Sequence, residues 1–577
     1  MSSEIVFDIE TDGLKPTKLW CIVAKSTTGE IQKFPPDKIQ EGIEYLKSAD
    51  TLIGHNIIGY DIPVIRKLYG VELTNKVYDT LVVSRLANPA QENGHSLKNW
   101  GFKIGYHKLE SPDSFEEYTP EMLKYCAQDV LLNELVYERL KKDTVLFDNE
   151  SIDLEHKVAV IIQQQRENGF AFDEKAAMTL LADLQHRMEE VKEEVRVTFK
   201  PKLIDDKLVT PYVKKDGTLS KRGLTDEEYD NCLWFGNNEP FMRKKLVEFN
   251  LGSRKQIGEY LTDFGWKPER FTPTGQPIVD EGTLKKIKHI PEAQLIAEFL
   301  LLQKRIAQIS SWIDAVEDTR IHGAVISNGA ITGRMTHRSP NTAQIPSLRQ
   351  PYGKECRACW TVDEGNVLLG IDASGLELRM LAHYMNDEEF TNEILNGDVH
   401  TANQKLAGLK TRDVAKTFIY ALMYGAGDAR LGNVMNASAK AGKKARELFF
   451  ENKPAFKTLN DKVKQTAMVR GYLKGLDKRV LWIRNEHASL NTLLQSAGAI
   501  VMKKALVIFD NKLRKHWLEH MFVANIHDEW QMEVPKEHAK TIGELGVSSI
   551  IEAGEEFKLR CPLDGEYKYG RDWSETH

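Results

Sequence analysis

Cysteine is scarce in this chain, which has 6 cysteines among 577 residues. They are scattered along the sequence and form no disulfide framework, so the chain fits a reducing compartment. Cys356 and Cys359 form a lone C-x-x-C, and no second His or Cys pair follows at a zinc-like spacing. The cysteines therefore indicate neither a disulfide-stabilised domain nor a zinc site.

Long apolar runs are missing as well. No stretch approaches the roughly 18 residues that a membrane-spanning helix needs, so we expect no membrane association. The first residues, MSSEIVFDIE, begin directly in a strand-like run without a basic and apolar leader, which gives no sign of export. The sequence also shows no internal repeat and no low-complexity tract.

An excess of positive charge is absent, since the formal net charge is −6. This does not exclude a nucleic-acid enzyme, because a phosphate backbone responds to the local field and not to the total charge. Carboxylates that are clustered to hold metal ions also make the total more negative. Hydrophobic residues make up 41% and charged residues 28% of the chain, as in a globular protein of about three to five domains.

The hydrophobic pattern predicts mixed α/β structure with a helix-rich middle. Strands are expected at 5–9 and 51–54, then a helix at 120–141 and a long helix over 151–200 that is broken near residue 168. Residues 201–247 have poor periodicity and read as loops or an insertion. Helices return over 250–316. Strands are then expected at 367–371, 522–526 and 530–534, with strong helices at 411–424 and 488–509.

Acidic residues gather at the end of the first expected strand. Asp8 and Glu10 are two apart on this strand, so they point to the same face. Two like charges at close range are costly unless a cation neutralises them, and oxygen ligands suit magnesium or manganese. A solvated acidic strand end remains the alternative for these two residues alone.

Further residues extend this acidic set. Asp61 follows a second strand, and Tyr125 and Asp129 share one face of an expected helix. The set resembles the tyrosine form of the DEDD exonuclease motif, found in the proofreading domain of family A DNA polymerases. The resemblance implies a two-metal nuclease in which Tyr125 orients the attacking water. We interpret His55 as a buried, hydrogen-bonded histidine in preference to a ligand.

A second acidic set lies towards the C-terminus. Asp372 ends an apolar strand and is followed by Glu377 and Arg379, while Asp528 and Glu529 lie at a tight turn between two strands. Each piece alone could be a surface turn. Together they can form a two-metal clamp for phosphoryl transfer, with Asp372 and Asp528 bridging the ions.

The helix expected at 411–424 carries a polar stripe. Arg412, Lys416 and Tyr420 are spaced four apart and share one face. Two cations one turn apart are unfavourable unless they face an anion such as a triphosphate, although a solvated basic face stays open as an alternative. Tyr420 would then present its ring to the nucleoside.

These segments resemble motifs A, B and C of family A DNA polymerases, and the pattern is most similar to T-seven-like podophage replicative enzymes. The strings TGRMTHRSPNTAQIP, GIDASGLELR, GDVHTANQ, TRDVAKTFIYALMYGAGD, LNTLLQSAGA and HDE follow the order of the family over residues 332 to 529. The resemblance implies an α/β multidomain fold. An RNase H-like 3′-5′ exonuclease domain would precede a right-hand polymerase with a helical thumb, a palm built on an antiparallel sheet, and helical fingers.

The resemblance also implies roles for individual residues in nucleotide binding. Glu377, packed with Tyr420, looks like a steric gate against a ribose 2′-hydroxyl. His400 looks like a triphosphate contact beside the two cations of the stripe. Tyr424 resembles a residue that stacks with the templating pair. Tyr at position 420 implies acceptance of dideoxynucleotides.

Four further residues are implied as DNA contacts. Arg334 looks like a contact to the duplex near the primer end, and His527 like a contact to the primer terminus. Asn491 and Gln495, one helical turn apart, resemble minor-groove readers, which check the shape of a base pair and not its sequence.

The implied domains are an exonuclease (1–145), a thumb (146–320) with an insertion at 201–247, a first palm part (321–390), fingers (391–480) and a second palm part (481–577). The acidic motif begins at Asp8, which leaves no room before it for a 5′ nuclease and favours a phage replicase. The insertion contains Lys207, Lys214, Lys215, Lys221 and Arg222. It lies where T-seven-like enzymes bind host thioredoxin, but partner binding, DNA contact and a plain loop all stay open.

The implied cofactors are two Mg²⁺ per active site, for which Mn²⁺ can substitute. Primer-template DNA, dNTPs, host thioredoxin or another processivity factor, a phage helicase-primase and a single-strand binding protein are the expected partners, in the cytoplasm of an infected bacterium. Three alternatives remain: a stand-alone nuclease with a degenerate polymerase-like tail, a single-subunit RNA polymerase, and a catalytically silent DNA-binding scaffold.

Overall fold

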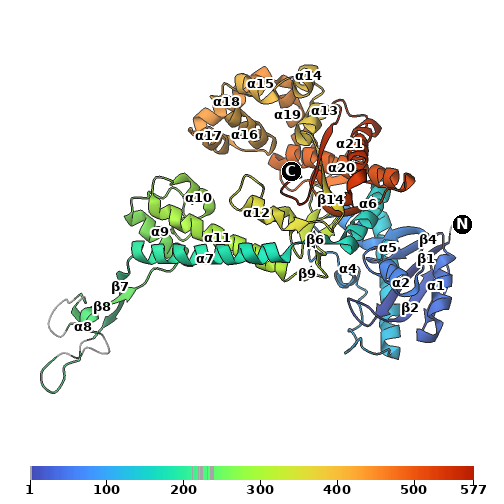
Figure 1. Ribbon diagram of the computed structural model, residues 1–577, viewed down its shortest axis with the longest axis horizontal. Helices are drawn as coiled ribbons and strands as arrows, with labels where there is room; N and C mark the ends of the chain where they lie inside the picture. The colour runs from blue at the N-terminus through green and yellow to red at the C-terminus, as the bar shows by residue number, and fades with distance from the viewer. Residues whose placement is uncertain are drawn as a thin grey trace. The chain divides into compact units, whose positions relative to one another are not determined.

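The computed structural model describes residues 3–210, 212–218, 220, 225–230, 232–233 and 239–576. The chain divides into two compact units (Figure 1). The first unit consists of Met1–Asp173 together with Ala315–His577, and the second consists of Glu174–Asp314. Each unit is described below by itself.

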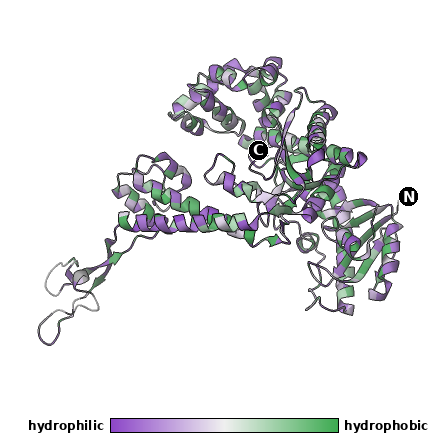
Figure 2. Cartoon of the chain, viewed as in Figure 1, coloured by the Kyte–Doolittle hydropathy of each residue, from purple (hydrophilic) through white to green (hydrophobic). Residues whose placement is uncertain are grey.

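The first unit begins with a five-stranded sheet in the order β3-β2-β1-β4-β5. Its strands are β1 (Glu4–Thr11), β2 (Leu19–Ser26), β3 (Ile31–Phe34), β4 (Thr51–Gly54) and β5 (Lys76–Asp79). The central strand β1 pairs antiparallel with β2 and parallel with β4. Most of its residues are buried, because helices cover both faces of the sheet, and Figure 2 shows its apolar residues in green.

Helices pack on both faces of this sheet, so residues that point to either side are buried. Phe7 and Ile9 pack with α1 (Ile39–Lys47) and α2 (Asp61–Tyr69) on one face. Val6 packs with Cys126 and Val130 of α5 (Pro120–Asp143) on the other face. The 3-10 helix η1 (Pro36–Lys38) precedes α1, and α3 (Thr80–Ala87) and α4 (Leu97–Ile104) follow the sheet.

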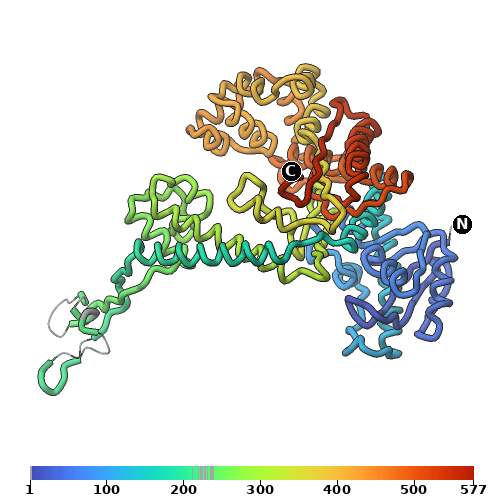
Figure 3. The backbone as a smooth tube through the Cα atoms, viewed as in Figure 1, coloured from blue at the N-terminus to red at the C-terminus, as the bar shows by residue number. Residues whose placement is uncertain are grey.

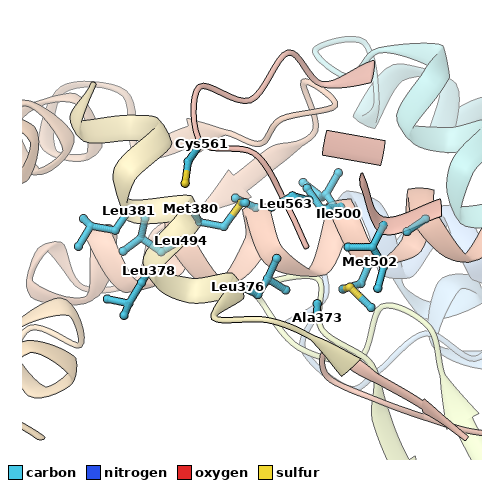
Figure 4. Close-up of a cluster of buried hydrophobic side chains, with 14 of the residues drawn as sticks. Ala373, Leu376, Leu378, Met380, Leu381, Leu494, Ile500, Met502, Cys561 and Leu563 are labelled. Carbon is cyan, nitrogen blue, oxygen red and sulfur yellow. The ribbon is translucent and has the colours of Figure 1, made fainter. Parts of the chain in front are cut away.

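A second sheet of the first unit has the order β17-β18-β14-β19 and is antiparallel throughout. Its strands are β14 (Asn366–Ala373), β17 (Met521–Ile526), β18 (Glu529–Pro535) and β19 (Gly565–Gly570). Ile371 and Trp530 belong to a large core with α20 (Ser489–Lys515) and α21 (Ala539–Glu556). Figure 4 shows part of this core, with Leu376 and Met380 of α13 (Leu376–Met385) near Ile500 of α20.

Helix α20 corrects the expectation that no segment approaches a membrane-spanning stretch. By length and composition, Glu486–Lys515 is long and apolar enough to cross a membrane. However, 89% of its most apolar window is buried inside the protein. An all-round apolar helix that is surrounded by other elements is the core helix of a globular fold.

Helices fill the segment between β14 and β17. After α13 they are α14 (Glu388–Asn396), α15 (Val399–Leu406), α16 (Arg412–Met423), α17 (Asp428–Val434), α18 (Ala439–Asn452) and α19 (Pro454–Arg470). The hairpin β15 (Tyr472–Lys474) and β16 (Val480–Trp482) and the 3-10 helix η3 (Glu486–Ala488) lead into α20, and η4 (Lys536–His538) leads into α21.

Smaller elements of the same unit surround the second sheet. A four-stranded sheet contains β13 (Trp360–Thr361), β6 (Phe170–Phe172), β10 (Arg320–Ile321) and β9 (Val316–Glu317) in that order. A hairpin consists of β11 (Ala324–Ile326) and β12 (Thr336–Arg338), followed by η2 (Thr342–Gln344) and α12 (Gly353–Ala358).

Helix α6 (Asn149–Asn168) differs from the sequence prediction, which groups it with the thumb at 146–320. It belongs to the first unit. Leu154, Val158 and Ile161 of α6 lie in the same core cluster as Phe522 and Met532 of the second sheet. The second compact unit starts at Glu174, because the apolar face of α6 is buried against the second sheet of the first unit.

The second unit is a helical body that carries a two-stranded ribbon. Its helices are α7 (Glu174–Thr198), α8 (Asp226–Asp230), α9 (Arg254–Asp263), α10 (Glu281–Lys286) and α11 (Pro291–Ile313). The long helices α7 and α11 pack together, and an ion pair of 2.8 Å joins Arg187 Nε to Glu298 Oε1.

The ribbon is a correction to the loops expected at 201–247. Strands β7 (Lys202–Val209) and β8 (Phe241–Val247) pair antiparallel, and Figure 3 shows them leaving the helices of the unit. The side chains of β7 are mostly exposed, and those of β8 are mostly half-buried, so neither strand shows the apolar alternation of a strand with one buried face. Lys207, Lys214 and Lys215 lie within the description, whereas Lys221 and Arg222 lie outside the described residues.

Candidate active sites

The C-terminal acid cluster, defined as Asp372, Asp528 and Glu529, forms at one end of the second sheet. The Cα of Asp372 on β14 pairs with that of Glu529 on β18. The backbone N–H of Ala373 donates to the carbonyl of Asp528 over 3.0 Å. His527 and Asp528 form the two-residue turn between β17 and β18, and His527 has a φ of 58°. The fold thus brings the three acids together from segments more than a hundred residues apart.

The environment of this cluster suits a divalent cation. Burial raises the pKa of Asp528, so its charged form lacks stabilisation by the protein alone. The side chains offer hard carboxylate oxygens, which are the ligands that magnesium prefers. Asp372 and Asp528 could therefore hold metal ions, with Glu529 beside them.

Glu377 connects two other candidate residues. Arg334 Nη2 lies 2.9 Å from Glu377 Oε1, and the hydroxyl of Tyr424 donates to Glu377 Oε2 over 2.8 Å. The resemblance implies that Glu377 packs with Tyr420, whereas its hydroxyl partner here is Tyr424. Tyr420 remains nearby, since its ring centroid lies 6.3 Å from that of Tyr424. Burial, then the charges of Glu377 and Asp528, raise the pKa of Tyr420.

The stripe on α16 meets the start of α15. Arg412 Nε donates to Asp398 Oδ2 over 2.7 Å, and Asp398 also caps α15 at the backbone N–H of His400. Burial, followed by the charges of Arg412 and Lys416, lowers the pKa of His400. The structure therefore gathers His400, Arg412 and Lys416 into one positive region, next to Tyr420, whose ring centroid is 6.4 Å from that of His400.

The remaining candidate DNA contacts are two residues of α20, together with Arg334 and His527, which lie beside Asp528. Asn491 and Gln495 are one turn apart on α20, and Asn491 Oδ1 is buried without a hydrogen-bond partner among the described residues. Burial and the charge of Arg334 lower the pKa of His527. Arg334 and His527 line one small cavity together with Lys503 and Asn525. Roles of these four residues in DNA binding are therefore left to the proposals below.

The N-terminal acid cluster, defined as Asp8, Glu10, Asp61 and Asp129, is the second candidate site. Asp8 and Glu10 lie on β1, Asp61 begins α2, and Asp129 lies on α5 one turn after Tyr125. Ligand atoms of Asp8, Glu10 and Cys126 all lie within 4.8 Å of one another. Asp61 Oδ1 and Asp129 Oδ1 are buried without a hydrogen-bond partner in the described part of the chain.

Burial and mutual repulsion make this cluster hard to ionise. The pKa of Asp8 is raised well above its usual range by burial and by the charges of Asp61 and Glu10. Burial, with the charge of Asp129, raises the pKa of Glu10 to about 8. Burial also raises the pKa of Asp61 to about 7. A divalent cation would relieve this repulsion and satisfy the unpaired oxygens, so these residues fit a metal site.

Two residues beside the N-terminal acid cluster were not predicted. Lys108 Nζ lies 2.5 Å from Asp129 Oδ2 and 4.7 Å from the centroid of the Tyr125 ring. Cys126 Sγ lies 3.8 Å from Asp8 Oδ2. Lys108 comes from a segment without periodicity, so the sequence contained no signal for its place. Cys126 follows Tyr125 directly but matches no part of the motif.

His55 is hydrogen bonded and not placed as a metal ligand. Its Nδ1 lies 2.9 Å from Thr80 Oγ1, and Thr80 in turn donates to Asn133 Oδ1 over 2.7 Å. Burial, with the charges of Arg85 and Lys108, lowers the pKa of His55 to about 3, so the ring is neutral. The hydrogen bond agrees with the interpretation of His55, although the residue is half-buried and lines the groove described next.

A groove of about 1000 Å³ lies beside the N-terminal acid cluster and extends to α6 and the β11–β12 hairpin. Its lining includes Arg85, Lys98, Lys108, Arg166 and Arg338. Burial lowers the pKa of Arg85, and the charge of Arg338 lowers it further. Cations at this density favour an anionic occupant with repeated charges.

Comparison with known proteins agrees with both the fold and these motifs. The model of "DNA polymerase family A" matches residues 237–575. The "DNA-directed DNA polymerase" of Enterobacteria phage T3 is 34% identical and that of Escherichia phage T7 is 33% identical; each alignment covers 99% of this chain and 100% of the relative.

A solved structure shows the same fold. It is the "POL domain of Pol1 from M. smegmatis complex with DNA primer-template and dNTP", with a TM-score of 0.79 and 18% identity, and the match covers 100% of this chain and 96% of that one. The predicted α/β multidomain fold is therefore confirmed. The family model spans more than half of this chain, and the two phage relatives align along their whole length. This chain belongs to DNA polymerase family A.

Proposed function

We propose that this family A, DNA-directed DNA polymerase adds dNTPs to a primer at the C-terminal acid cluster. The observation that carries the proposal is the register of β14 and β18, which places Asp372 opposite Glu529 and beside Asp528. Asp372 and Asp528 would hold two Mg²⁺ ions, or Mn²⁺ in their place, which activate the primer 3′-hydroxyl and stabilise charge on the triphosphate. Glu529 supports this acid pair.

The positive region on α15 and α16 is the proposed triphosphate site. Arg412 can pair with phosphate oxygens in a fork geometry, while Lys416 acts as a point charge. The hydrogen bond from Arg412 to Asp398 orients the guanidinium group before the nucleotide binds. A His400 ring with a lowered pKa can approach the two cations without adding a third full charge.

Glu377 and Tyr420 are the proposed discriminators of the sugar. Arg334 and Tyr424 hold the carboxylate of Glu377 in place, and we expect this fixed carboxylate to exclude a ribose 2′-hydroxyl. We expect strong chain termination at near-equimolar dideoxynucleotide and a clear preference for dNTPs over rNTPs. Weak termination would contradict the proposed role of Tyr420 in accepting dideoxynucleotides. Efficient incorporation of rNTPs would favour the alternative of an RNA polymerase.

Four other residues are proposed to bind DNA or the templating pair. Arg334 and His527 line one cavity near the acids and would contact the primer terminus. The unpaired buried oxygen of Asn491, with Gln495 one turn further on, suits contact with the minor groove. Tyr424, at the end of α16, would stack near the templating base.

Replacing one acid tests the polymerase site. Asp528→Asn should abolish primer extension with Mg²⁺ while leaving binding of primer-template DNA measurable. Asp461→Asn, an exposed acid on α19, is the matched control and should extend as the unaltered chain does. Retained extension by Asp528→Asn would show that the reaction occurs elsewhere, whereas no extension by the unaltered chain would favour the catalytically silent DNA-binding scaffold.

We propose a second activity, a 3′-5′ exonuclease, at the N-terminal acid cluster. The repelling acids and the two unpaired carboxylate oxygens support a site for two divalent cations held by Asp8, Glu10, Asp61 and Asp129. Tyr125 would orient the attacking water, and Lys108 anchors Asp129. The cationic groove beside the cluster suits the phosphates of a single strand.

Hydrolysis of a single strand tests this second site. Asp8→Ala should stop the release of nucleotides from the 3′ end of a labelled oligodeoxynucleotide. Asp37→Ala, an exposed acid on η1, is the control and should digest the strand normally. Persistent hydrolysis by Asp8→Ala would place the nuclease elsewhere or trace it to a contaminant.

The ribbon of the second unit is the proposed site for a processivity partner. Leu203, Ile204, Leu208 and Leu246 are exposed apolar residues on its two strands, and Lys207 adds a charge. We propose host thioredoxin or another processivity factor as the occupant. Thioredoxin should lengthen products of the intact chain but not of a chain whose ribbon is replaced by a short linker. Equal product lengths in both chains would exclude it.

The phage relatives lead us to propose a role in phage genome replication inside the infected bacterial cell. A helicase-primase and a single-strand binding protein of the phage are the proposed further partners. The domain roles proposed for this chain are an exonuclease around the first sheet, a thumb in Glu174–Asp314, a palm around the second sheet, and fingers in α14 to α19.

A further inference from the structure

Glu529 is held by a residue from the far end of the chain. Trp573 Nε1 donates to Glu529 Oε1 over 2.8 Å, and Gln531 Nε2 donates to the same oxygen over 2.5 Å. Glu529, Gln531 and Trp573 are all buried. Both donors are neutral, so they fix the carboxylate without cancelling its charge.

Trp573 is itself fixed from several sides. Its backbone N–H donates to the carbonyl of Trp360 over 2.9 Å. The guanidinium carbon of Arg357 lies 4.8 Å from the centroid of its ring, and the Phe170 ring lies 5.7 Å away. The side chain is 1% exposed. An indole enclosed in this way cannot turn its N–H away from Glu529.

The strand register gives this contact a place in the active site. Glu529 and Asp372 are directly paired across two strands, and such cross-strand residues share a face of the sheet. Gln531, two residues further on, faces the same side and accepts from Thr576 Oγ1 over 2.9 Å. The segment around Trp573 therefore lies under the acid cluster and contacts it through Glu529.

We propose that Trp573 is a positioning residue for polymerisation: its indole N–H fixes Glu529 beside Asp372 and Asp528. The proposal rests on the proposed role of Glu529 in supporting the acid pair. Residues that orient a metal-binding carboxylate typically change metal affinity or activity by about 10–100-fold when they are lost. The sequence motifs described above end at residue 529, so the fold is what connects Trp573 to the site.

A double-mutant cycle tests the contact. Trp573→Phe keeps the ring but removes the N–H, and should lower kcat by about tenfold and raise the half-saturating Mg²⁺ concentration. In a Glu529→Gln background the same change should cost less than about twofold, because coupled residues are not additive. Mn²⁺ binding to the protein, counted by electron paramagnetic resonance without nucleotide, should weaken in Trp573→Phe.

The matched control is Trp100→Phe. Trp100 is also 1% exposed, and its indole N–H donates to Ser84 Oγ over 2.9 Å in the N-terminal part of the unit. It should lose a similar amount of thermal stability but keep the Mg²⁺ dependence of extension. Gln531→Leu removes the other donor to Glu529 and provides a second test if Trp573→Phe does not fold.

Each outcome decides between separate claims. The positioning role would be overturned if Trp573→Phe kept the normal half-saturating Mg²⁺ concentration. In that case kcat would fall only in proportion to the fraction of folded protein. The role would also be overturned if Trp573→Phe lowered kcat by the same factor with and without Glu529→Gln. If Glu529→Gln alone extends primers at the normal rate, the proposed role of Glu529 fails, and with it the reason for positioning this side chain.

Discussion

At the scale of single residues, the N-terminal acid cluster shows how burial creates a need for cations. Four carboxylates that would ionise readily in water are packed between a sheet and helices, where their charges repel one another. Lys108 neutralises only Asp129 by direct contact. The protein alone therefore favours the protonated cluster, and a divalent cation favours the ionised one.

Thermal stability without divalent ions should fall as the pH rises. Glu10 and Asp61 have pKa values of about 8 and about 7 in the folded protein, against 4.5 and 3.8 in an unfolded chain. Groups with raised pKa values stabilise the fold below their unfolded pKa and lose that contribution as the pH passes the folded value. In EDTA, the unfolding temperature should therefore decrease between about pH 4 and pH 8.

Magnesium should reverse this trend, with a larger stabilisation at pH 8 than at pH 6. A Glu10→Gln variant should show a flatter pH profile in EDTA, because one titrating group is gone. Calorimetric unfolding scans measure both effects. A profile of the unaltered chain that is flat, or equal to that of the variant, would contradict the repulsion described here.

Gly425 sets the position of Tyr424 through its backbone. Gly425 has a φ of 76°, and a Cβ at this position would lie 2.1 Å from the carbonyl oxygen of His487. Gly425→Ala should cost more than the about 1–3 kcal/mol of a left-handed non-glycine residue, since the clash adds to the strain. It should slow extension while single-strand hydrolysis continues. Gly427→Ala, where a Cβ meets no atom within 4 Å, is the control.

At the scale of elements, prediction succeeded where burial imposes a pattern. The strands at β4, β14 and β18 and the helices α5, α16 and α20 lie close to their expected positions, because each buries an apolar face or run. The ribbon β7–β8 was missed because neither strand alternates between a buried apolar face and an exposed polar face. Helix α6 was assigned to the wrong body, since its pattern shows that it packs but not which partner it packs against.

A buried charge cluster joins three elements of the first unit. Glu155 Oε1 of α6 lies 2.6 Å from Lys503 Nζ of α20 and 2.7 Å from Arg479 Nη1 in the β15–β16 hairpin. Arg479 also donates to Asp477 over 2.6 Å, and all four residues are buried. Burial lowers the pKa of Lys503 to about 8.

Breaking this cluster should destabilise the protein strongly. Glu155→Gln leaves two buried cations with one acid between them and should cost about 3–5 kcal/mol in the free energy of unfolding. Lys504 lies next to Lys503 on α20, and Lys504→Met breaks its partly exposed pair with Glu556 of α21, which should change stability by about 1 kcal/mol or less. Urea unfolding measures both, and equal losses in the two variants would contradict a special role for the buried cluster.

At the scale of the whole molecule, two acid clusters share one compact unit. Helix α3, which follows the first sheet, contacts segments of the C-terminal part of the unit: Asn328 Nδ2 donates to the carbonyl of Arg85 over 3.0 Å, and Trp482 Nε1 donates to the carbonyl of Ala87 over 2.7 Å. One compact unit would therefore carry both the polymerisation site and the proposed proofreading site. Each proposed activity still depends on its own carboxylates.

The sequence predicted the acids of both sites because motif spacing and strand ends mark them. It could not predict Lys108, Asp398 as the partner of Arg412, or Trp573 beneath Glu529, because these contacts join segments that only the fold brings together. The same limit explains why Glu377 was expected to pack with Tyr420, while the hydroxyl that reaches it is that of Tyr424. The sequence shows which residues share one face of a strand or helix, but it does not show which residues of other elements they contact.

Extension of a matched and a 3′-mismatched primer, with Mg²⁺ and dNTPs, tests most directly whether one chain carries two separable activities. The unaltered chain should extend both primers, after trimming the mismatched one. Asp8→Ala should extend the matched primer but leave the mismatch in place, and Asp528→Ala should trim without extending. Loss of both activities in either variant, or trimming that persists in Asp8→Ala, would contradict the assignment of each reaction to its own acid cluster.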